Sequence, residues 1–135
     1  ARHLGAEVFA TASPGKQARV RELGVDQARI ASSRSTEFAV RFREVTGGRG
    51  VDVVVDALAG EFGDASLGLV APGGRFVEMG KADIRDPADV AARWPGVSYR
   101  AFDLMEAGPE RIGEILSAVL DLFDRGVLTE LPVRC

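Results

Sequence analysis

The feature that most constrains the fold is a nearly unbroken run of valines at residues 51–56. β-Branched residues favour strands, and consecutive apolar residues fit a strand that is covered on both faces, as in a parallel sheet. Similar segments that favour strands recur at residues 6–12, 28–31, 75–79 and 97–103. Amphipathic stretches separate them, and the longest begins near Pro109 and ends near Arg125. This alternation predicts βαβ units and a parallel sheet.

The start of the chain does not match the start of such a fold. In a doubly wound nucleotide-binding domain the first strand lies in the middle of the sheet, and a glycine-rich phosphate loop follows it. Residues 1–5 instead resemble the end of a helix, and no such loop comes after them. We therefore expect residues 1–135 to form one incomplete α/β domain, a doubly wound (Rossmann-like) parallel sheet that lacks its first strand and glycine-rich loop.

Composition fits one ordinary globular domain, with 135 residues, 46% hydrophobic, 27% charged and a net charge of -3. The positive charges are scattered among acidic ones, which argues against nucleic-acid binding, and no apolar run approaches the roughly 20 residues that span a membrane. The single cysteine, Cys135, cannot form an internal disulfide, which indicates a reducing compartment such as the cytoplasm. With His3 at the opposite end, no structural zinc site is expected.

The first candidate site follows the strand expected at residues 6–12. NAD-specific domains place an Asp or Glu there for the ribose 2′-hydroxyl, whereas this chain has Ser13, with Lys16 one helical turn later. A hydroxyl, a helix N-terminus and a cation suit a 2′-phosphate, and Arg34 could flank the same place. An N-cap serine beside two solvated surface cations explains the same spacing equally well.

The second candidate is the turn at residues 56–60, which follows the valine-rich strand. Ligands of open α/β sheets lie at the carboxyl ends of the strands, and small residues there would let a nicotinamide ring approach the backbone at Leu58 and Ala59. From position alone, an ordinary turn between a strand and a helix is the alternative.

The third candidate combines Lys81, which follows Met79 and Gly80 at the end of one strand, with Asp103, which ends another. Both positions would lie at the same edge of a parallel sheet. An ammonium and a carboxylate that share a pocket there could act as proton donor and orienting partner. On position alone, a surface ion pair or two unrelated solvated charges remain the alternative.

Several segments together resemble the medium-chain dehydrogenase/reductase superfamily, namely residues 46–54, 69–77 and 80–81. Further segments make the chain similar to one group within it, the enoyl reductase domains of type I (modular) polyketide synthases. These segments are residues 7–13, 32–34, 76–81, 83–86, 99–104 and 126–132. The resemblance covers essentially the whole chain, and its motifs are specific as a set rather than one by one.

This resemblance implies an enzyme that uses NADPH to reduce an α,β-unsaturated acyl thioester carried on an acyl carrier protein. It implies Lys81 as proton donor or enolate stabiliser and Asp103 as its partner. The cofactor-binding positions that it implies are Ser13, Lys16, Arg34, Leu58, Ala59, Met79 and Gly80. The acyl carrier protein and the other domains of the same synthase would be its protein partners.

Two departures keep other functions open. Asp56 and Ala57 stand where the family usually has Asn-Ser, and the missing phosphate loop favours a non-catalytic nucleotide-binding module. For the same reason, we expect the isolated chain to bind NADPH poorly. A free-standing quinone reductase would share the fold and the cofactor but would not need Lys81 and Asp103. A zinc alcohol dehydrogenase is disfavoured because this half of the enzyme shows no metal ligands, although the catalytic ligands of such an enzyme would lie mainly in the other half.

Overall fold

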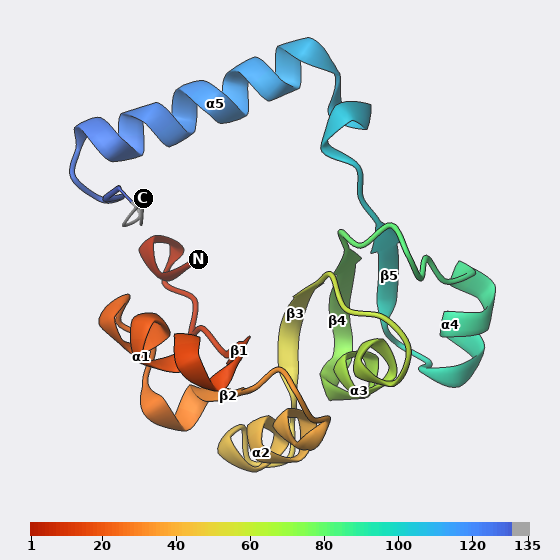
Figure 1. The fold of residues 1–135 in the computed structure, drawn as a ribbon. Helices are drawn as coiled ribbons and strands as arrows, with labels where there is room; N and C mark the ends of the chain where they lie inside the picture. The colour runs from red at the N-terminus through yellow and green to blue at the C-terminus, as the bar shows by residue number, and fades with distance from the viewer. Residues whose placement is uncertain (131–135) are drawn as a thin grey trace. The chain divides into compact units, whose positions relative to one another are not determined.

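The computed structural model describes residues 1–130, so Cys135 and the predicted segment at residues 131–132 lie outside the described residues. The chain divides into two compact units, Ala1–Phe102 and Asp103–Cys135. Each unit is described by itself below (Figure 1).

The first unit holds two parallel sheets. In one sheet, β1 (Ala10–Ala12) pairs with β2 (Ile30–Ser32). In the other, β3 (Val51–Asp56) pairs with β4 (Val70–Glu78), and β4 pairs with β5 (Ser98–Ala101). All strand pairs are parallel, which confirms the predicted α/β class.

Helices connect the strands, as βαβ units require. They are α1 (Pro14–Glu22) after β1, α2 (Glu37–Val45) after β2, α3 (Glu61–Leu69) after β3 and α4 (Pro87–Arg93) after β4. Two 3-10 turns, Arg2–Leu4 and Gln27–Arg29, complete the unit. Proline begins both α1 and α4, where its fixed φ suits the first helical position. The carboxylate of Asp86 accepts hydrogen bonds from two N–H groups at the start of α4.

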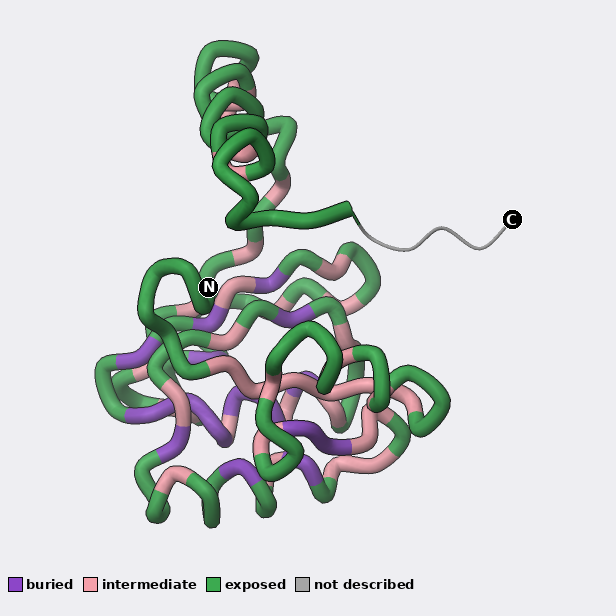
Figure 2. Tube along the Cα trace, turned by 90° about the vertical axis from the view of Figure 1, so that its left-hand side faces the viewer, coloured by how far each residue is buried: buried purple, intermediate pink, exposed green. Residues whose placement is uncertain are grey.

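The core of the first unit consists of two clusters of buried apolar side chains, one on each side of β3. The first contains Ala31, Phe38, Phe42 and Leu69, and the second contains Leu67, Val70, Phe76 and Val90. Trp94 and Tyr99 pack against the second cluster. Figure 2 shows these buried segments in purple.

The second unit contains a 3-10 turn at Leu104–Ala107 and α5 (Gly108–Asp124), which confirms the predicted long helix. The apolar positions of α5 fall at helical spacing, but none of its residues is buried. Ile115, Leu116, Leu120 and Phe123 remain between 37% and 56% exposed.

The prediction that the valine-rich strand is covered on both faces is wrong for the described chain. Val53 and Val55 of β3 are 46% and 61% exposed. They line a cavity of about 680 Å³ that Phe9 and Thr11 also line. Within residues 1–130 no strand pairs with both β1 and β3, so the two sheets stay separate. These two valines therefore stay exposed in the part of the chain that the structure describes.

Two element boundaries also differ from the prediction. The strand expected at residues 6–12 shortens to Ala10–Ala12, because pairing with β2 begins only at Ala10. The turn expected at residues 72–74 lies inside β4, where the register with β3 shifts. Gly73 has a φ of 79°, and glycine permits this local bend without ending the strand.

Candidate functional site

The predicted phosphate-binding residues lie together at the carboxyl edge of the β1–β2 sheet. Ser13 directly follows β1, and Lys16 lies exposed in the first turn of α1. Arg34 is exposed in the turn after β2. The N–H of Ser33 donates to the carbonyl of Ala12 at 3.1 Å, so the two turns lie side by side.

The chemistry of this edge suits an anion. Ser13 occupies the N-cap position of the nine-residue helix α1, but its hydroxyl makes no capping hydrogen bond. The helix N-terminus carries partial positive charge, and the cations of Lys16 and Arg34 flank it. A phosphate group has the charge and the acceptor oxygens that these groups can satisfy.

A second edge forms where β3 and β4 end. The N–H groups of Ala57 and Leu58 donate to Oδ1 of Asp56 at 3.0 and 3.1 Å. The N–H of Met79 donates to the main-chain carbonyl of Asp56 at 2.7 Å. The predicted nicotinamide-side residues therefore lie in two adjacent turns, residues 56–60 and 79–80.

Gly80 leaves room for the carboxylate of Glu78. Its N–H donates to Oε1 of Glu78. A Cβ at this position would lie 2.6 Å from that oxygen, whereas its distance of 3.5 Å from Cα of Ala57 would be an ordinary van der Waals contact. Alanine at position 80 would therefore displace the Glu78 carboxylate.

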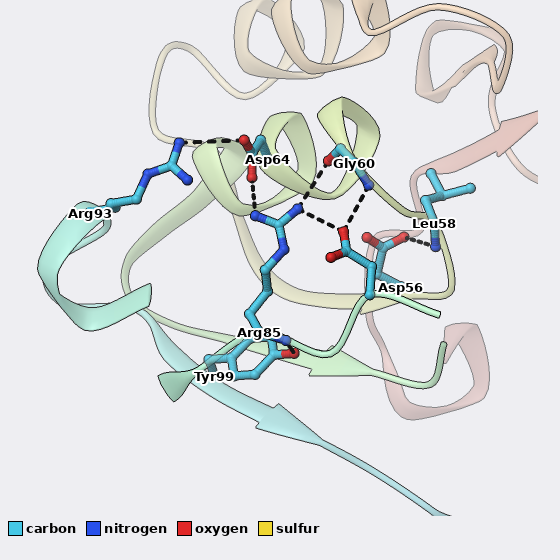
Figure 3. Close-up of polar contacts among 8 residues, drawn as sticks. Asp56, Leu58, Gly60, Asp64, Arg85, Arg93 and Tyr99 are labelled. Carbon is cyan, nitrogen blue, oxygen red and sulfur yellow. Dashed lines mark hydrogen bonds and ion pairs between the residues drawn. The ribbon is translucent and has the colours of Figure 1, made fainter. Parts of the chain in front are cut away.

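A polar network centred on Arg85 fixes the end of the first turn (Figure 3). One guanidinium nitrogen donates to the carbonyl of Gly60 at 3.1 Å and to Asp83 at 2.9 Å. The other donates to Asp64 at the start of α3. Asp83 in turn accepts the N–H of Gly60 at 2.8 Å.

Two more contacts join this network to the later elements. The main-chain N–H of Arg85 donates to the hydroxyl of Tyr99 on β5 at 2.9 Å, and Arg93 of α4 contacts Asp64 at 3.4 Å (Figure 3). Hydrogen bonds from Gly60 and Arg85 lower the pKa of Asp83. The network therefore ties the turn after β3 to α3, α4 and β5.

Two carboxyl groups at this edge titrate abnormally. Burial raises the pKa of Asp56, although hydrogen bonds from Leu58 and Ala57 oppose the shift. Burial also raises the pKa of Glu78. Raised pKa values in a candidate site are typical of functional positions.

Sequence reasoning missed Glu78 and Arg85 as site residues. It named Asp56 as the first residue of the candidate turn at residues 56–60 and as a departure from the family pattern, but gave it no role of its own. A signal existed for each of them. Asp56 and Glu78 each lie at or near the end of a predicted strand. Arg85 lies two residues after Asp83, in the segment at residues 83–86 that resembles polyketide synthase enoyl reductases.

Lys81 and Asp103 occupy the predicted positions after their strands. Lys81 is exposed and lies just after β4 in the first unit. Asp103 opens the second unit, where its carboxylate accepts the N–H of Met105 at 3.0 Å. Their pairing stays a prediction, since it involves both units.

Residues 1–130 contain no group of three His, Cys, Asp or Glu side chains that could hold a metal ion. None of the helices in these residues has the length and apolar character needed to cross a membrane.

A family model for zinc-binding dehydrogenases matches residues 23–134. Mycoketide-CoA synthase of Mycobacterium tuberculosis is 63% identical over 133 residues, which are 98% of this chain and 3% of the synthase. The chain therefore spans a small part of this relative.

Solved structures agree with the sequence relatives. The CurK enoyl reductase superposes with a TM-score of 0.89 at 41% identity, over 96% of this chain and 40% of that one. A mycobacterial protein complexed with NADPH superposes with a TM-score of 0.81 at 25% identity, over 96% of this chain and 42% of that one. The chain belongs to the zinc-binding dehydrogenase family, in the medium-chain dehydrogenase/reductase superfamily, and it is an enoyl-reductase-like region of the kind found in polyketide synthases.

Proposed function

We propose that this chain forms the NADPH-binding part of a polyketide synthase enoyl reductase, which reduces an α,β-unsaturated acyl thioester on an acyl carrier protein. The observation that carries the proposal is the grouping of the cofactor-binding candidates at strand ends. Ser13, Lys16 and Arg34 lie at the carboxyl edge of the β1–β2 sheet. The turns at residues 56–60 and 79–80 adjoin at the edge where β3 and β4 end.

The residues at the first edge fit the 2′-phosphate of NADPH. The Ser13 hydroxyl is not used as a helix cap, which weakens the reading of this residue as an ordinary N-cap. Lys16 and Arg34 are both exposed beside it. We propose that these three side chains bind the phosphate through charge-assisted hydrogen bonds.

The residues at the second edge suit the nicotinamide half of the cofactor. Leu58, Ala59, Met79 and Gly80 present small or apolar groups next to a backbone that is already fixed by Asp56 and Glu78. We propose that these turns position the ring and exclude water from one of its faces. When bound, NADPH supplies the hydride that reduces the β-carbon of the substrate.

We propose that Lys81 holds the proton for the α-carbon or stabilises negative charge on the thioester oxygen, and that Asp103 orients it. The chain path supports this assignment. Phe102, the residue before Asp103, donates its N–H to the carbonyl of Glu78 at 2.7 Å, three residues before Lys81. General acid catalysis of this kind typically contributes about 10²–10⁴-fold to rate.

The same proposal treats residues 1–135 as one incomplete domain. The match to the family model runs from residue 23 to residue 134 and so crosses the border between the two units. Other domains of a synthase would be its partners. A cytoplasmic, reducing location agrees with the single cysteine of the sequence.

The test uses a complete enoyl reductase built around residues 1–135, with NADPH oxidation followed in the presence of an enoyl thioester. The double variant Lys81→Met and Asp103→Asn should lose at least about a hundredfold in kcat while its NADPH Kd changes less than about twofold. The matched control is Arg111→Met with Glu114→Gln, which removes an exposed ion pair on α5.

Three outcomes separate the alternatives. Unchanged turnover in the double variant would remove the proton-donor role from Lys81 and Asp103. Reduction of a quinone but not of the thioester would favour a quinone reductase. Failure of the unsubstituted protein to oxidise NADPH with either substrate would favour a non-catalytic module.

A further inference from the structure

Two buried carboxyl groups lie side by side where β3 and β4 end. Asp56 and Glu78 are register partners on these adjacent parallel strands, and they are only 5% and 3% exposed. Register partners in a parallel sheet project to the same face, with strands about 4.8 Å apart. Two carboxyl groups this close in an interior of low polarity cannot both carry a charge without a large cost.

The two oxygens of Asp56 have different surroundings. Oδ1 accepts the N–H groups of Ala57 and Leu58. Oδ2 is buried and has no hydrogen-bond partner among the described residues. A buried carboxylate oxygen without a donor loses its hydration and gains nothing in return. A proton on Oδ2 would turn that atom into a donor.

The neighbouring charged groups do not neutralise the two carboxyl groups. Arg85 is the nearby cation, but its guanidinium already binds Asp64, Asp83 and the carbonyl of Gly60. The other titratable groups of this network, on α4 and β5, are Arg93 and Tyr99. Asp83 adds negative charge near Glu78. Within this network, a proton is the most direct way to neutralise the pair.

We propose that Asp56 and Glu78 hold one proton between them, carried on Oδ2 of Asp56, and that the pair thereby fixes the turns after β3 and β4 relative to each other. Asp56 already accepts the N–H groups of Ala57 and Leu58 in the turn after β3, and Glu78 accepts the N–H of Gly80 in the turn after β4. Both residues therefore act as positioning residues. The consequence for NADPH rests on the proposed function, whereas the shared proton does not.

The direction of both pKa shifts agrees with this arrangement. Burial raises the pKa of Asp56 and of Glu78, and the negative charge of Asp56 adds to the shift of Glu78. Groups whose pKa is raised by folding stabilise the folded state at low pH. That stabilisation is lost as the pH rises through the raised pKa. The free energy of unfolding should therefore fall as the solution passes from mildly acidic to alkaline pH.

Asp56→Asn provides the sharpest variant, because the amide places a permanent N–H donor where the proposal places the O–H. In the chain with Asp56→Asn, the fall of the unfolding free energy with pH should become smaller, because only the burial of Glu78 still raises a carboxyl pKa, and Glu78 should titrate at a lower pH than in the unsubstituted chain. The matched control is Asp52→Asn on the same strand. Asp52 is exposed and paired with Arg49, so this variant should keep the fall.

The unsubstituted chain tests the proposal independently of any variant's folding. Carboxyl ¹³C shifts of Asp56 and Glu78, followed through a pH titration, should show two coupled steps with the second well above the ordinary carboxyl range. Two independent steps within the ordinary range would overturn the shared proton. An unchanged fall of the unfolding free energy in folded Asp56→Asn would overturn it as well.

The positioning role is tested by NADPH binding to the complete reductase. Asp56→Ala should weaken NADPH binding about tenfold more than Asp56→Asn, because alanine removes the acceptor for two N–H groups. Equal affinities of the two variants would overturn the positioning role. If the unsubstituted protein bound no NADPH, the proposed function would fail, while the carboxyl titration would still decide the shared proton.

Discussion

Arg85 is the side chain on which the turn after β3 most depends. It is only 20% exposed, and it joins two aspartates to the carbonyl of Gly60. Arg85→Ala would remove these contacts and leave Asp64 with its longer contact to Arg93. We expect the free energy of unfolding of the chain to fall by about 1–3 kcal/mol, as measured by denaturant titration.

Arg93→Ala is the matched control for this prediction. Arg93 contacts the same Asp64, but it is 59% exposed and its contact is longer, at 3.4 Å. Exposed pairs of this kind contribute little, so the loss should stay below about 0.5 kcal/mol. Equal losses in the two variants would show that the network does not hold the turn.

The cations at the first edge should determine cofactor choice. In the complete reductase, Lys16→Ala with Arg34→Ala should weaken NADPH binding by about 10–100-fold and leave the NADH affinity nearly unchanged. The double variant Arg19→Ala with Arg21→Ala, also on α1, is the control and should alter neither affinity. A parallel loss of NADPH and NADH binding would contradict the assignment of the 2′-phosphate.

At the scale of elements, local patterns predicted most strands and helices. The valine run defined β3 and the spacing of apolar residues defined α5, because these signals depend only on nearby residues. Burial could not be predicted in the same way. Whether Val55 is covered depends on a strand that would have to come from outside residues 51–56, and the local pattern of valines carries no information about it.

The residues of the candidate site also differ in whether the sequence alone could predict them. Ser13, Lys16 and Arg34 could be predicted because ligands of α/β folds lie at strand ends, a rule that needs only element order. The roles of Asp56, Glu78 and Arg85 could not, because they depend on burial and on contacts between β3, β4 and the segment after β4.

The exposed face of β3 gives a prediction that belongs to this element. Val55→Asp should change the free energy of unfolding of the 135-residue chain by less than about 0.5 kcal/mol, since Val55 is 61% exposed. In the complete reductase, where we expect a strand between β1 and β3, the same change should cost more than about 2 kcal/mol. Denaturant titration of both proteins measures the difference.

Val54→Asp is the control for this experiment. Val54 packs against the buried cluster around Phe76 and should therefore be costly to replace in both proteins. An equally small effect of Val55→Asp in the two proteins would mean that no strand fills the cavity beside β3.

At the scale of the whole molecule, the chain holds cofactor-binding candidates on two sheet edges. Within residues 1–130, the sheets that carry these edges are not joined by a common strand. We therefore propose that NADPH binds to the complete reductase, and we expect little binding by the isolated chain. We infer that a single cofactor spans both edges.

A structure of the complete reductase with bound NADPH tests this claim most directly. We expect the 2′-phosphate to contact Ser13, Lys16 and Arg34, and the nicotinamide ring to contact the turns at residues 56–60 and 79–80. A cofactor bound elsewhere, or a 2′-phosphate with none of these three side chains within hydrogen-bond distance, would contradict it.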